Sequence, residues 1–136
     1  MTPEAERYLL KAREFLVKAR EVLEHWPDEA GRASYLAAFH AAQALIFERT
    51  GTVAKTHSGV RAQFGKLVKE DPDCGAELRS FLGRAYNLKA TADYETGPGA
   101  EIAPERAALA ITTASRFVSY VAGLLRDNHG DDKPEA

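Results

Sequence analysis

Residues 35–47 read YLAAFHAAQALIF, and this stretch decides the fold. Wound as a helix, it presents apolar side chains on nearly every side. Such a helix either lies at the centre of a domain or buries one face inside and a second face against another chain. Its many alanines allow neighbouring helices to approach closely. We expect this helix to begin at Asp28, capped there, and to end at residues 50–51, where Gly51 is a suitable C-terminal cap.

A first helix precedes the central one. Thr2 is a good N-cap, Pro3 suits the first turn, and Pro27 ends the helix. Apolar residues recur along it at spacings of three and four, which predicts one buried stripe. They are Tyr8, Ala12, Phe15, Ala19, Val22 and Trp26.

A third helix follows a short loop at residues 55–58. Either Thr56 or Ser58 can cap it, because both are hydroxyl residues placed just before an apolar periodic segment. The aspartate, proline and glycine residues at 71–75 break it.

Two more helices complete the pattern. The fourth covers residues 76–93, and the fifth begins near Pro104, with a loop rich in glycine and proline at residues 95–100 between them. The sequence contains no β-hairpin signal, repeat or low-complexity block. We therefore expect an all-α protein with five helices in a single domain over residues 1–127. Residues 128–136 are polar and charged, and we expect them to form a disordered tail.

Composition narrows the classes of function. A net charge of −2 argues against a broadly basic surface that grips nucleic acid, although it leaves room for a local basic patch. Cys74 is the only cysteine, so no internal disulfide can form and a reducing compartment is favoured. The N-terminus opens acidic rather than with a secretory leader. The apolar stretches are interrupted by His40, Gln43 and Arg116, so we expect a cytoplasmic protein without a membrane span.

Metal and cofactor motifs are missing from the sequence. A di-iron bundle needs Glu-x-x-His pairs, and no histidine here has a glutamate three residues before it. One cysteine and scattered histidines give no zinc site, and no phosphate loop, dinucleotide glycine motif or Gly-x-Ser-x-Gly elbow occurs. Hydroxyls flank His57, but helix capping explains Thr56 and Ser58 better than nucleophilic catalysis does. We expect neither a metal nor a cofactor.

His40 lies on an apolar face of the central helix, and two interpretations stay open. The imidazole is a core or interface group satisfied by a hydrogen bond. Alternatively, it belongs to a ligand or dimer contact together with Arg32 and Tyr35.

The fourth helix combines cations with aromatic rings. These residues are Arg79, Arg84, Tyr86, Lys89 and Tyr94. Together they can hold a phosphate and stack a base, or they can form a solvated face. Lys89 and Asp93 are one turn apart and can simply pair with each other.

Three segments, taken together and in this order, resemble the HEPN superfamily. They are residues 32–42, which contain Arg32, Tyr35 and His40; residues 55–66, which begin Lys55-Thr56-His57-Ser58; and Ala92-Asp93-Tyr94. More narrowly, the pattern is similar to the small prokaryotic UPF0332-like group, from about residue 9 to residue 125. The resemblance implies an up-and-down bundle of four main helices plus one short helix.

The resemblance also implies partners and an activity. HEPN proteins commonly form homodimers, and many pair with a minimal nucleotidyltransferase encoded beside them, often as toxin and antitoxin. Many are metal-independent ribonucleases with an Arg-x4–6-His motif. That chemistry needs a cation to stabilise the charge of the phosphorane and an imidazole to move the proton of the 2′-hydroxyl.

This chain departs from the motif. Lys89 stands where the arginine is expected, and Asp93 or Tyr94 stands where the histidine is expected. A tyrosine, with an unperturbed pKa near 10, is a poor general base at neutral pH. Lys89, Asp93 and Tyr94 are the remaining catalytic candidates, although Asp93 and Tyr94 can also be structural and close the turn after the fourth helix.

Three functional hypotheses follow. The favoured one is a HEPN interaction protein, a homodimer that pairs with a minimal nucleotidyltransferase in a toxin–antitoxin-like system and binds nucleotide or RNA. The alternative is a metal-independent ribonuclease toxin with a non-standard active site, formed by Lys89 with Tyr94 or by His57 with Arg61. The third is a structural or small-ligand bundle unconnected with nucleic acid. The residues expected to contact a ligand or partner are Arg32, Tyr35, His40, Lys55, His57, Lys89, Asp93 and Tyr94.

Overall fold

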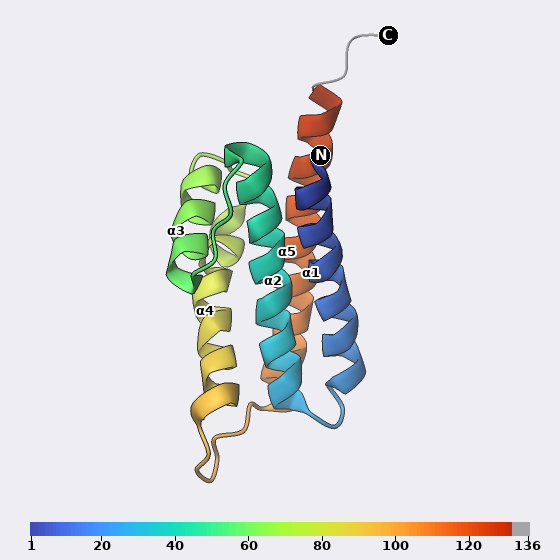
Figure 1. Ribbon diagram of the computed structural model, residues 1–136. Helices are drawn as coiled ribbons and strands as arrows, with labels where there is room; N and C mark the ends of the chain where they lie inside the picture. Colours follow the sequence, from blue (N-terminus) through green and yellow to red (C-terminus); the bar gives the residue numbers. More distant parts are fainter. Residues whose placement is uncertain (132–136) are drawn as a thin grey trace.

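The fold is an all-α bundle organised around one central helix (Figure 1). The structure is a computed structural model that describes residues 1–131. Its helices are α1 (Pro3–Val22), α2 (Pro27–Thr50), α3 (His57–Val68), α4 (Gly75–Tyr94) and α5 (Pro104–Asp131). Helices α1, α2, α4 and α5 alternate in direction, and the short α3 lies beside α4. The expected bundle of four main helices plus one short helix is therefore confirmed.

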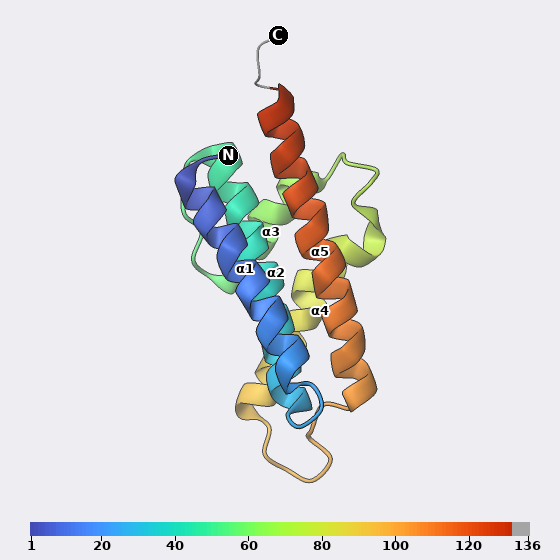
Figure 2. The ribbon, with the colours of Figure 1, turned by 90° about the vertical axis from the view of Figure 1, so that its right-hand side faces the viewer.

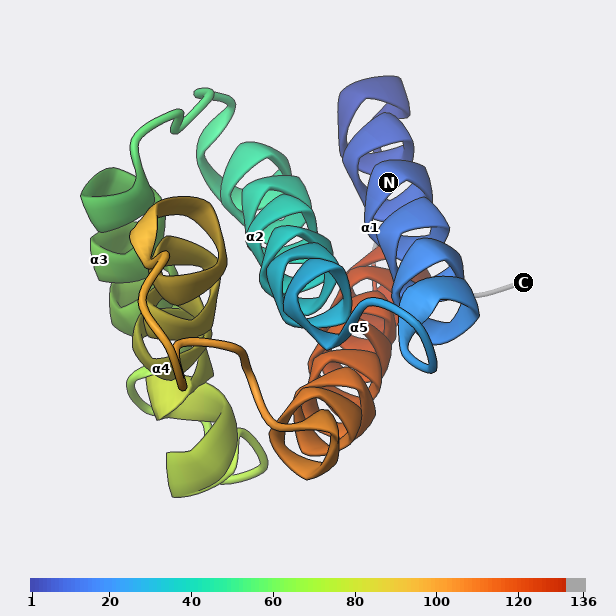
Figure 3. The same ribbon diagram turned by 90° about the horizontal axis from the view of Figure 1, so that it is seen from below.

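Helix α2 occupies the centre, because it packs against each of the other four helices. Seen from below, it lies between the pair α3 and α4 on one side and the pair α1 and α5 on the other (Figure 3). Its alanines Ala37, Ala38, Ala41 and Ala42 are fully buried, so neighbouring backbones can come close on several sides. Of the two placements that its apolar surface allowed, the structure shows the central one.

The caps expected for three helix ends are present. The Thr2 hydroxyl accepts a hydrogen bond from the Ala5 N–H at 3.1 Å, and the Thr56 hydroxyl accepts one from the Gly59 N–H at 2.9 Å. Gly51 ends α2 with a φ of 71°, a left-handed conformation that glycine adopts without strain. Local sequence chemistry thus determines these three boundaries.

Two other boundaries differ from expectation. Helix α1 ends at Val22 rather than near Trp26, whose side chain is 65% exposed and takes no part in the buried stripe. Helix α2 begins at Pro27, since a proline at the first helical position lacks only an N–H that would be unpaired there. Asp28 is consequently not the cap; its Oδ1 accepts a hydrogen bond from the Ile102 N–H at 2.7 Å and ties down the loop before α5.

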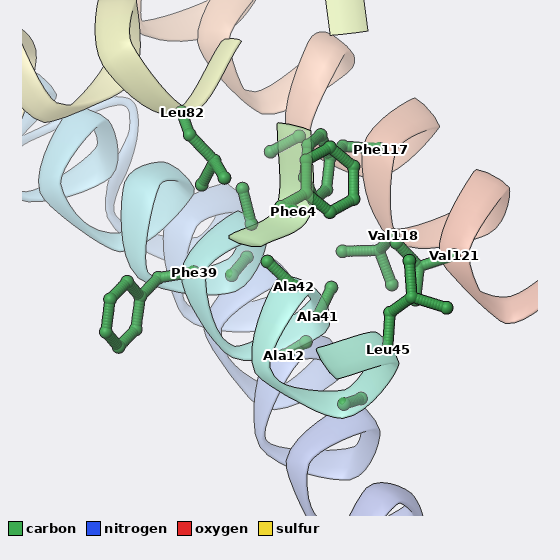
Figure 4. Packing of buried hydrophobic residues seen from close by; sticks show 14 of the residues in the cluster. Ala12, Phe39, Ala41, Ala42, Leu45, Phe64, Leu82, Phe117, Val118 and Val121 are labelled. Carbon is green, nitrogen blue, oxygen red and sulfur yellow. The ribbon is translucent and has the colours of Figure 1, made fainter. Parts of the chain in front are cut away.

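The main core contains buried side chains from all five helices. The rings of Phe64 and Phe117 meet at 4.8 Å between centroids, and Leu45, Val118 and Val121 pack nearby (Figure 4). Phe39 projects from α2 away from this group. The opposite side of α2 is therefore available for a different set of contacts.

The turn between α3 and α4 is fastened to α5. The Tyr120 hydroxyl donates a hydrogen bond to Asp71 Oδ2 at 2.5 Å, and Cys74 in the same turn is 2% exposed. Burial raises the pKa of the Cys74 thiol. The lone cysteine is therefore a core residue rather than a surface thiol.

Helix α5 is long and packs against α1, α2 and α4 (Figure 2). Its segment Pro104–Asp127 is apolar enough by length and composition to cross a membrane, with a mean hydropathy of 1.4. The prediction that Arg116 excludes such a span is therefore wrong on those two criteria. Half of the apolar window is buried inside the bundle, as it is in the core helix of a folded domain. The helix runs to Asp131, beyond the predicted domain end at residue 127, and residues 132–136 lie outside the described residues.

Candidate functional site

A pocket of about 320 Å³ opens where α2, α3 and α4 meet. Each helix contributes side chains to its wall: Tyr35 from α2, His57 and Arg61 from α3, and Tyr86 from α4, together with Thr56 and Ser58 at the start of α3. The cap at Thr56 fixes the first turn of α3, so it also fixes the position of His57.

His57 is the centre of an aromatic cluster. Its ring centroid lies 4.8 Å from that of Tyr86, 5.3 Å from that of Phe39 and 5.4 Å from that of Tyr35. Burial, and secondly the positive charge of Lys89, lowers the pKa of His57 below its ordinary value. The imidazole is therefore neutral at pH 7, and Lys89 lies near enough to influence it.

The orientation of His57 is set by Tyr35. The Tyr35 hydroxyl and His57 Nδ1 share a hydrogen bond of 2.5 Å. Burial raises the pKa of Tyr35, with the neighbouring Tyr86 adding to the effect, so the hydroxyl keeps its proton. Within the described part of the chain, nothing bonds to His57 Nε2. That nitrogen is thus the polar atom of the ring that a ligand can reach.

Arg61 brings a cation to the same wall. It lies one turn after His57 on α3, which places both residues on one face of the helix. Its guanidinium passes close to Gly83 of α4, where an added Cβ would meet Arg61 Nη1 at 3.5 Å. The positive charge also acts on Tyr35, opposing the effect of burial on its pKa.

Asp93 joins two cations beside this pocket. Its Oδ1 lies 3.2 Å from Arg32 Nε of α2, and its Oδ2 accepts a hydrogen bond from Lys89 one turn earlier on α4. The Lys89 and Asp93 side chains are only 15% and 22% exposed. The bond from Lys89 holds the pKa of Asp93 below its usual range, so the carboxylate stays ionised. The expected pairing of Lys89 with Asp93 is confirmed, and Arg32 extends it to α2.

The structure groups only some of the predicted site residues. Tyr35 and His57 are in contact, with Lys89 nearby, whereas Lys55 is exposed in the loop before α3 and Tyr94 is 75% exposed at the end of α4.

His40 does not share a site with Arg32 and Tyr35. It lies on the other side of Phe39, in a second pocket between α1 and α2, with its Nδ1 2.8 Å from Gln43 Oε1. The structure therefore does not bring His40 together with Arg32 and Tyr35, and a ligand or dimer contact of His40 stays a prediction. The hydrogen-bonded imidazole of the first interpretation is what the structure shows.

The cations of α4 also separate. Arg79 donates a hydrogen bond of 2.6 Å to the Asp71 carbonyl, and Arg84 donates one of 3.0 Å to the Glu77 carbonyl, so both guanidinium groups serve the start of α4. Of the charged and aromatic residues along this helix, Tyr86 lines the pocket and Lys89 lies beside it. The sequence placed Arg61 and Tyr86 on separate helices but gave no signal that α3 and α4 would bring them together.

No group of three or more histidine, cysteine, aspartate or glutamate side chains in the described part of the chain is arranged to hold a metal ion. The chemistry available in the pocket is that of a neutral imidazole, two tyrosines and nearby cations. Such a set binds anions, stacks flat rings and transfers protons.

Comparison with known proteins gives a fold and a family. No match was found among curated proteins. The crystal structure of TT1696 from Thermus thermophilus is similar, with a TM-score of 0.74 and 24% sequence identity over 90% of this chain and 98% of that one. At this identity the likeness shows a shared fold. The model of the HEPN domain family matches residues 5–124, and because that match covers all five helices apart from the start of α1 and the end of α5, this chain belongs to the HEPN domain family.

Proposed function

We propose that this chain is a HEPN interaction protein that binds the phosphate and base of a nucleotide or of RNA in the pocket between α2, α3 and α4. The observation that carries the proposal is the convergence of Arg61 and Lys89 with the rings of His57 and Tyr86. Guanidinium and ammonium groups bind phosphate, and aromatic rings stack on bases without regard to sequence. The overall charge of −2 fits a local site of this kind better than a broad nucleic-acid surface.

A binding titration tests this site directly. AMP and a fluorescently labelled single-stranded RNA hexamer serve as probes, with affinity measured by calorimetry and by fluorescence anisotropy. We expect Arg61→Ala to weaken binding of both probes by at least tenfold, because a phosphate contact is lost. Arg84→Ala is the matched control, since Arg84 is bonded within its own helix. Equal affinities for the two variants, or no binding by the wild-type protein, would refute the proposal.

The proposal includes protein partners. The protein acts in the cytoplasm as a homodimer, and it pairs with a minimal nucleotidyltransferase in a toxin–antitoxin-like system of the UPF0332-like group. Membership of the HEPN family supports this role. So do Leu10 and Val17 on α1, which are 57% and 51% exposed and two turns apart on one face.

An affinity pull-down from the native host tests the partner. Mass spectrometry of the retained proteins should identify a small nucleotidyltransferase. Retention of the protein alone, with expression of neighbouring genes verified, would exclude the two-protein system and leave a solitary dimer.

A second candidate function is RNA cleavage, favoured by the neutral state of His57 beside Arg61. His57 would take the proton of a 2′-hydroxyl while that oxygen attacks the adjacent phosphate. The bond from phosphorus to the 5′-oxygen breaks, and the leaving oxygen takes a proton from water. Arg61 and Lys89 would stabilise the phosphorane charge. The products would be a 2′,3′-cyclic phosphate and a 5′-hydroxyl.

Cleavage is distinguished from binding by the ends of the RNA. Mass spectrometry of an RNA oligomer incubated with the protein should show cyclic phosphate ends that disappear with His57→Ala. Intact RNA, together with harmless overexpression of the protein, would exclude this activity and leave the binding role unaffected.

A further inference from the structure

A second pocket, of about 390 Å³, lies between α1, α2 and the loop that joins α2 to α3. Arg7, Tyr8 and Lys11 line it from α1, His40 lines it from α2, and Val53 lines it from the loop. Its volume is within the range of pockets that hold small ligands. None of its side chains belongs to the pocket around His57.

The hydrogen bonds of Gln43 determine which nitrogen of His40 carries the proton. Gln43 Nε2 donates to the carbonyl oxygen of Ala54 at 2.8 Å, because a carbonyl can only accept. Gln43 Oε1 therefore faces His40, and it requires a proton on His40 Nδ1. In the neutral ring, Nε2 then has a free lone pair. No described residue bonds to Nε2, so His40 presents a hydrogen-bond acceptor to the pocket.

Two side chains of the wall, Arg7 and Lys11, are cationic. Arg7 and Lys11 are exposed, one turn apart on α1, and neither forms an ion pair with another residue of the described chain. Glu4 is the one carboxylate on the wall, so two cations face one anion. The pocket thus attracts negative charge beside an acceptor nitrogen.

The ring of His40 is held rigidly. It stacks on Phe15 of α1, with 5.5 Å between centroids and 19° between planes, and Phe39 meets its edge at 5.5 Å. A fixed ring with a fixed tautomer suits recognition of a ligand, because little conformational freedom is lost on binding. Tyr8 and Val53 add apolar surface for a flat or hydrocarbon part of the ligand.

We infer that this pocket is a second binding site, which takes a phosphomonoester that also carries an O–H or N–H donor, as sugar phosphates and nucleoside monophosphates do. Arg7 and Lys11 bind the phosphate, and the donor bonds to His40 Nε2. The site does not depend on the function proposed for the pocket around His57. It lies close to that pocket, because the Phe39 ring contacts both His40 and His57.

Titrations of the full chain with inorganic phosphate, ribose 5-phosphate and AMP test the inference. Proton–carbon NMR spectra of the histidine rings report each pocket separately, through His40 and His57. We expect ribose 5-phosphate or AMP to shift the His40 signals and to bind at least tenfold more tightly than inorganic phosphate. AMP alone saturating the site would identify a nucleotide ligand, and equal binding of both would identify a sugar phosphate.

Variants separate the two pockets. The double variant Arg7→Ala/Lys11→Ala should weaken the response of His40 by at least tenfold, and Arg61→Ala should leave it unchanged. Arg13→Ala is the matched control, since Arg13 is exposed on α1 two residues from Lys11 and therefore points to another side of the helix. His40→Phe keeps the stacking on Phe15 but removes the acceptor, so in calorimetric titrations, which do not need the His40 signal, it should abolish the advantage of ribose 5-phosphate over phosphate.

Three results would overturn the inference. These are probes that shift His57 but not His40, a double variant that binds like Arg13→Ala, and inorganic phosphate that binds as tightly as both ribose 5-phosphate and AMP. Loss of binding with Arg61→Ala alone would support the site around His57 and count against this one. Circular dichroism establishes that each variant is folded, and should His40→Phe fail to fold, the double variant decides.

Discussion

Gln43 is the side chain on which two separate parts of the molecule depend. It is 7% exposed, and its amide bonds at once to His40 of the same helix and to the Ala54 carbonyl in the following loop. A buried amide with both ends satisfied stabilises the fold modestly, whereas its removal leaves two polar groups without partners. One glutamine therefore positions the loop and determines the tautomer of His40.

Replacement of Gln43 by leucine, which has a similar volume, tests this dependence. We expect the free energy of unfolding to fall by about 2–3 kcal/mol, because the Ala54 carbonyl and His40 Nδ1 lose their partners. Urea denaturation measures the change. Gln63→Leu on α3 is the control, since this half-buried glutamine makes no side-chain hydrogen bond in the described structure, and it should change stability by less than about 0.5 kcal/mol. Equal effects of the two substitutions would contradict the role given to Gln43.

The two tyrosines of the His57 pocket provide a second test at the level of residues. Tyr35→Phe removes the hydroxyl bonded to His57 Nδ1 and should cost about 1 kcal/mol of stability. Tyr86→Phe should cost less than about 0.5 kcal/mol, because no described group bonds to its hydroxyl. Thermal and chemical denaturation of both variants give the comparison. The prediction fails if Tyr86→Phe is the more destabilising of the two.

Among the elements, α3 is the shortest, and it carries three residues of the pocket, His57, Ser58 and Arg61. An isolated helix of this length is marginal in water, so its order depends on the cap and on packing. Val60, Phe64 and Val68 supply the packing as its buried face. The geometry of the pocket therefore depends on how firmly α3 is held.

Replacing either of two glycines of α3 by alanine should have opposite effects on stability. An added Cβ at Gly65 meets nothing within 4 Å, so Gly65→Ala should raise stability by roughly 0.5–1 kcal/mol through helix propensity. A Cβ at Gly59 would lie 2.6 Å from the Thr56 hydroxyl and displace the cap, so Gly59→Ala should give no gain or a loss. The denaturant midpoints of the Gly65→Ala and Gly59→Ala variants measure both effects. A stabilising Gly59→Ala would show that the cap at Thr56 contributes little.

Elements and sites differ in how far the sequence determines them. The helix at α2 and the caps at Thr2, Thr56 and Gly51 depend on residues within a few positions of one another, and these predictions are confirmed. The start of α2 was misplaced because Asp28, a good cap by type, is used instead in a bond to Ile102, 74 residues away.

The site was predicted less completely, because it depends on contacts between helices. The pairing of Lys89 with Asp93 is local to α4 and was expected. The contact between Tyr35 and His57 joins α2 to α3, and no periodicity encodes it. Membership of the HEPN family was correctly indicated by three short segments, whereas the roles of the individual residues stay predictions.

At the scale of the whole molecule, two half-buried histidines predict a dependence of stability on pH. Burial lowers the pKa of both His40 and His57 below the unfolded value of 6.5, so the unfolded chain binds protons more readily. Stability contributed by the neutral rings is fully present above that value and is lost as pH falls below it. Asp71 and Asp93 have lowered pKa values too, but they act only below their ordinary value of 3.8.

Melting temperatures between pH 8 and pH 5 measure this effect. We expect little change down to about pH 7 and a decrease below about pH 6.5. His57→Gln should make the decrease shallower, and His25→Gln, at an exposed position, should not. A wild-type protein that is more stable at pH 5 than at pH 7 would contradict the sign of both shifts.

The proposed homodimer gives a second prediction at the scale of the whole molecule. If the outer face of α1 forms the dimer, then Leu10→Glu/Val17→Glu should shift the protein to monomer in sedimentation experiments at micromolar concentration. Leu109→Glu on α5 is the matched control, because Leu109 is 62% exposed but lies on another helix. If the protein stays a dimer with Leu10→Glu/Val17→Glu but becomes a monomer with Leu109→Glu, the interface lies on α5 instead.

The buried Cys74 gives the molecule a built-in probe of its own motion. Its thiol is 2% exposed and its pKa is raised, so a maleimide or disulfide reagent can reach a thiolate there only after the turn between α3 and α4 has opened. The rate of labelling, compared with that of a fully accessible thiol, thus measures the free energy of that local opening. Because the native thiol is shielded, cysteines introduced at surface positions can also be labelled selectively, which permits distance measurements between helices in solution without removal of Cys74.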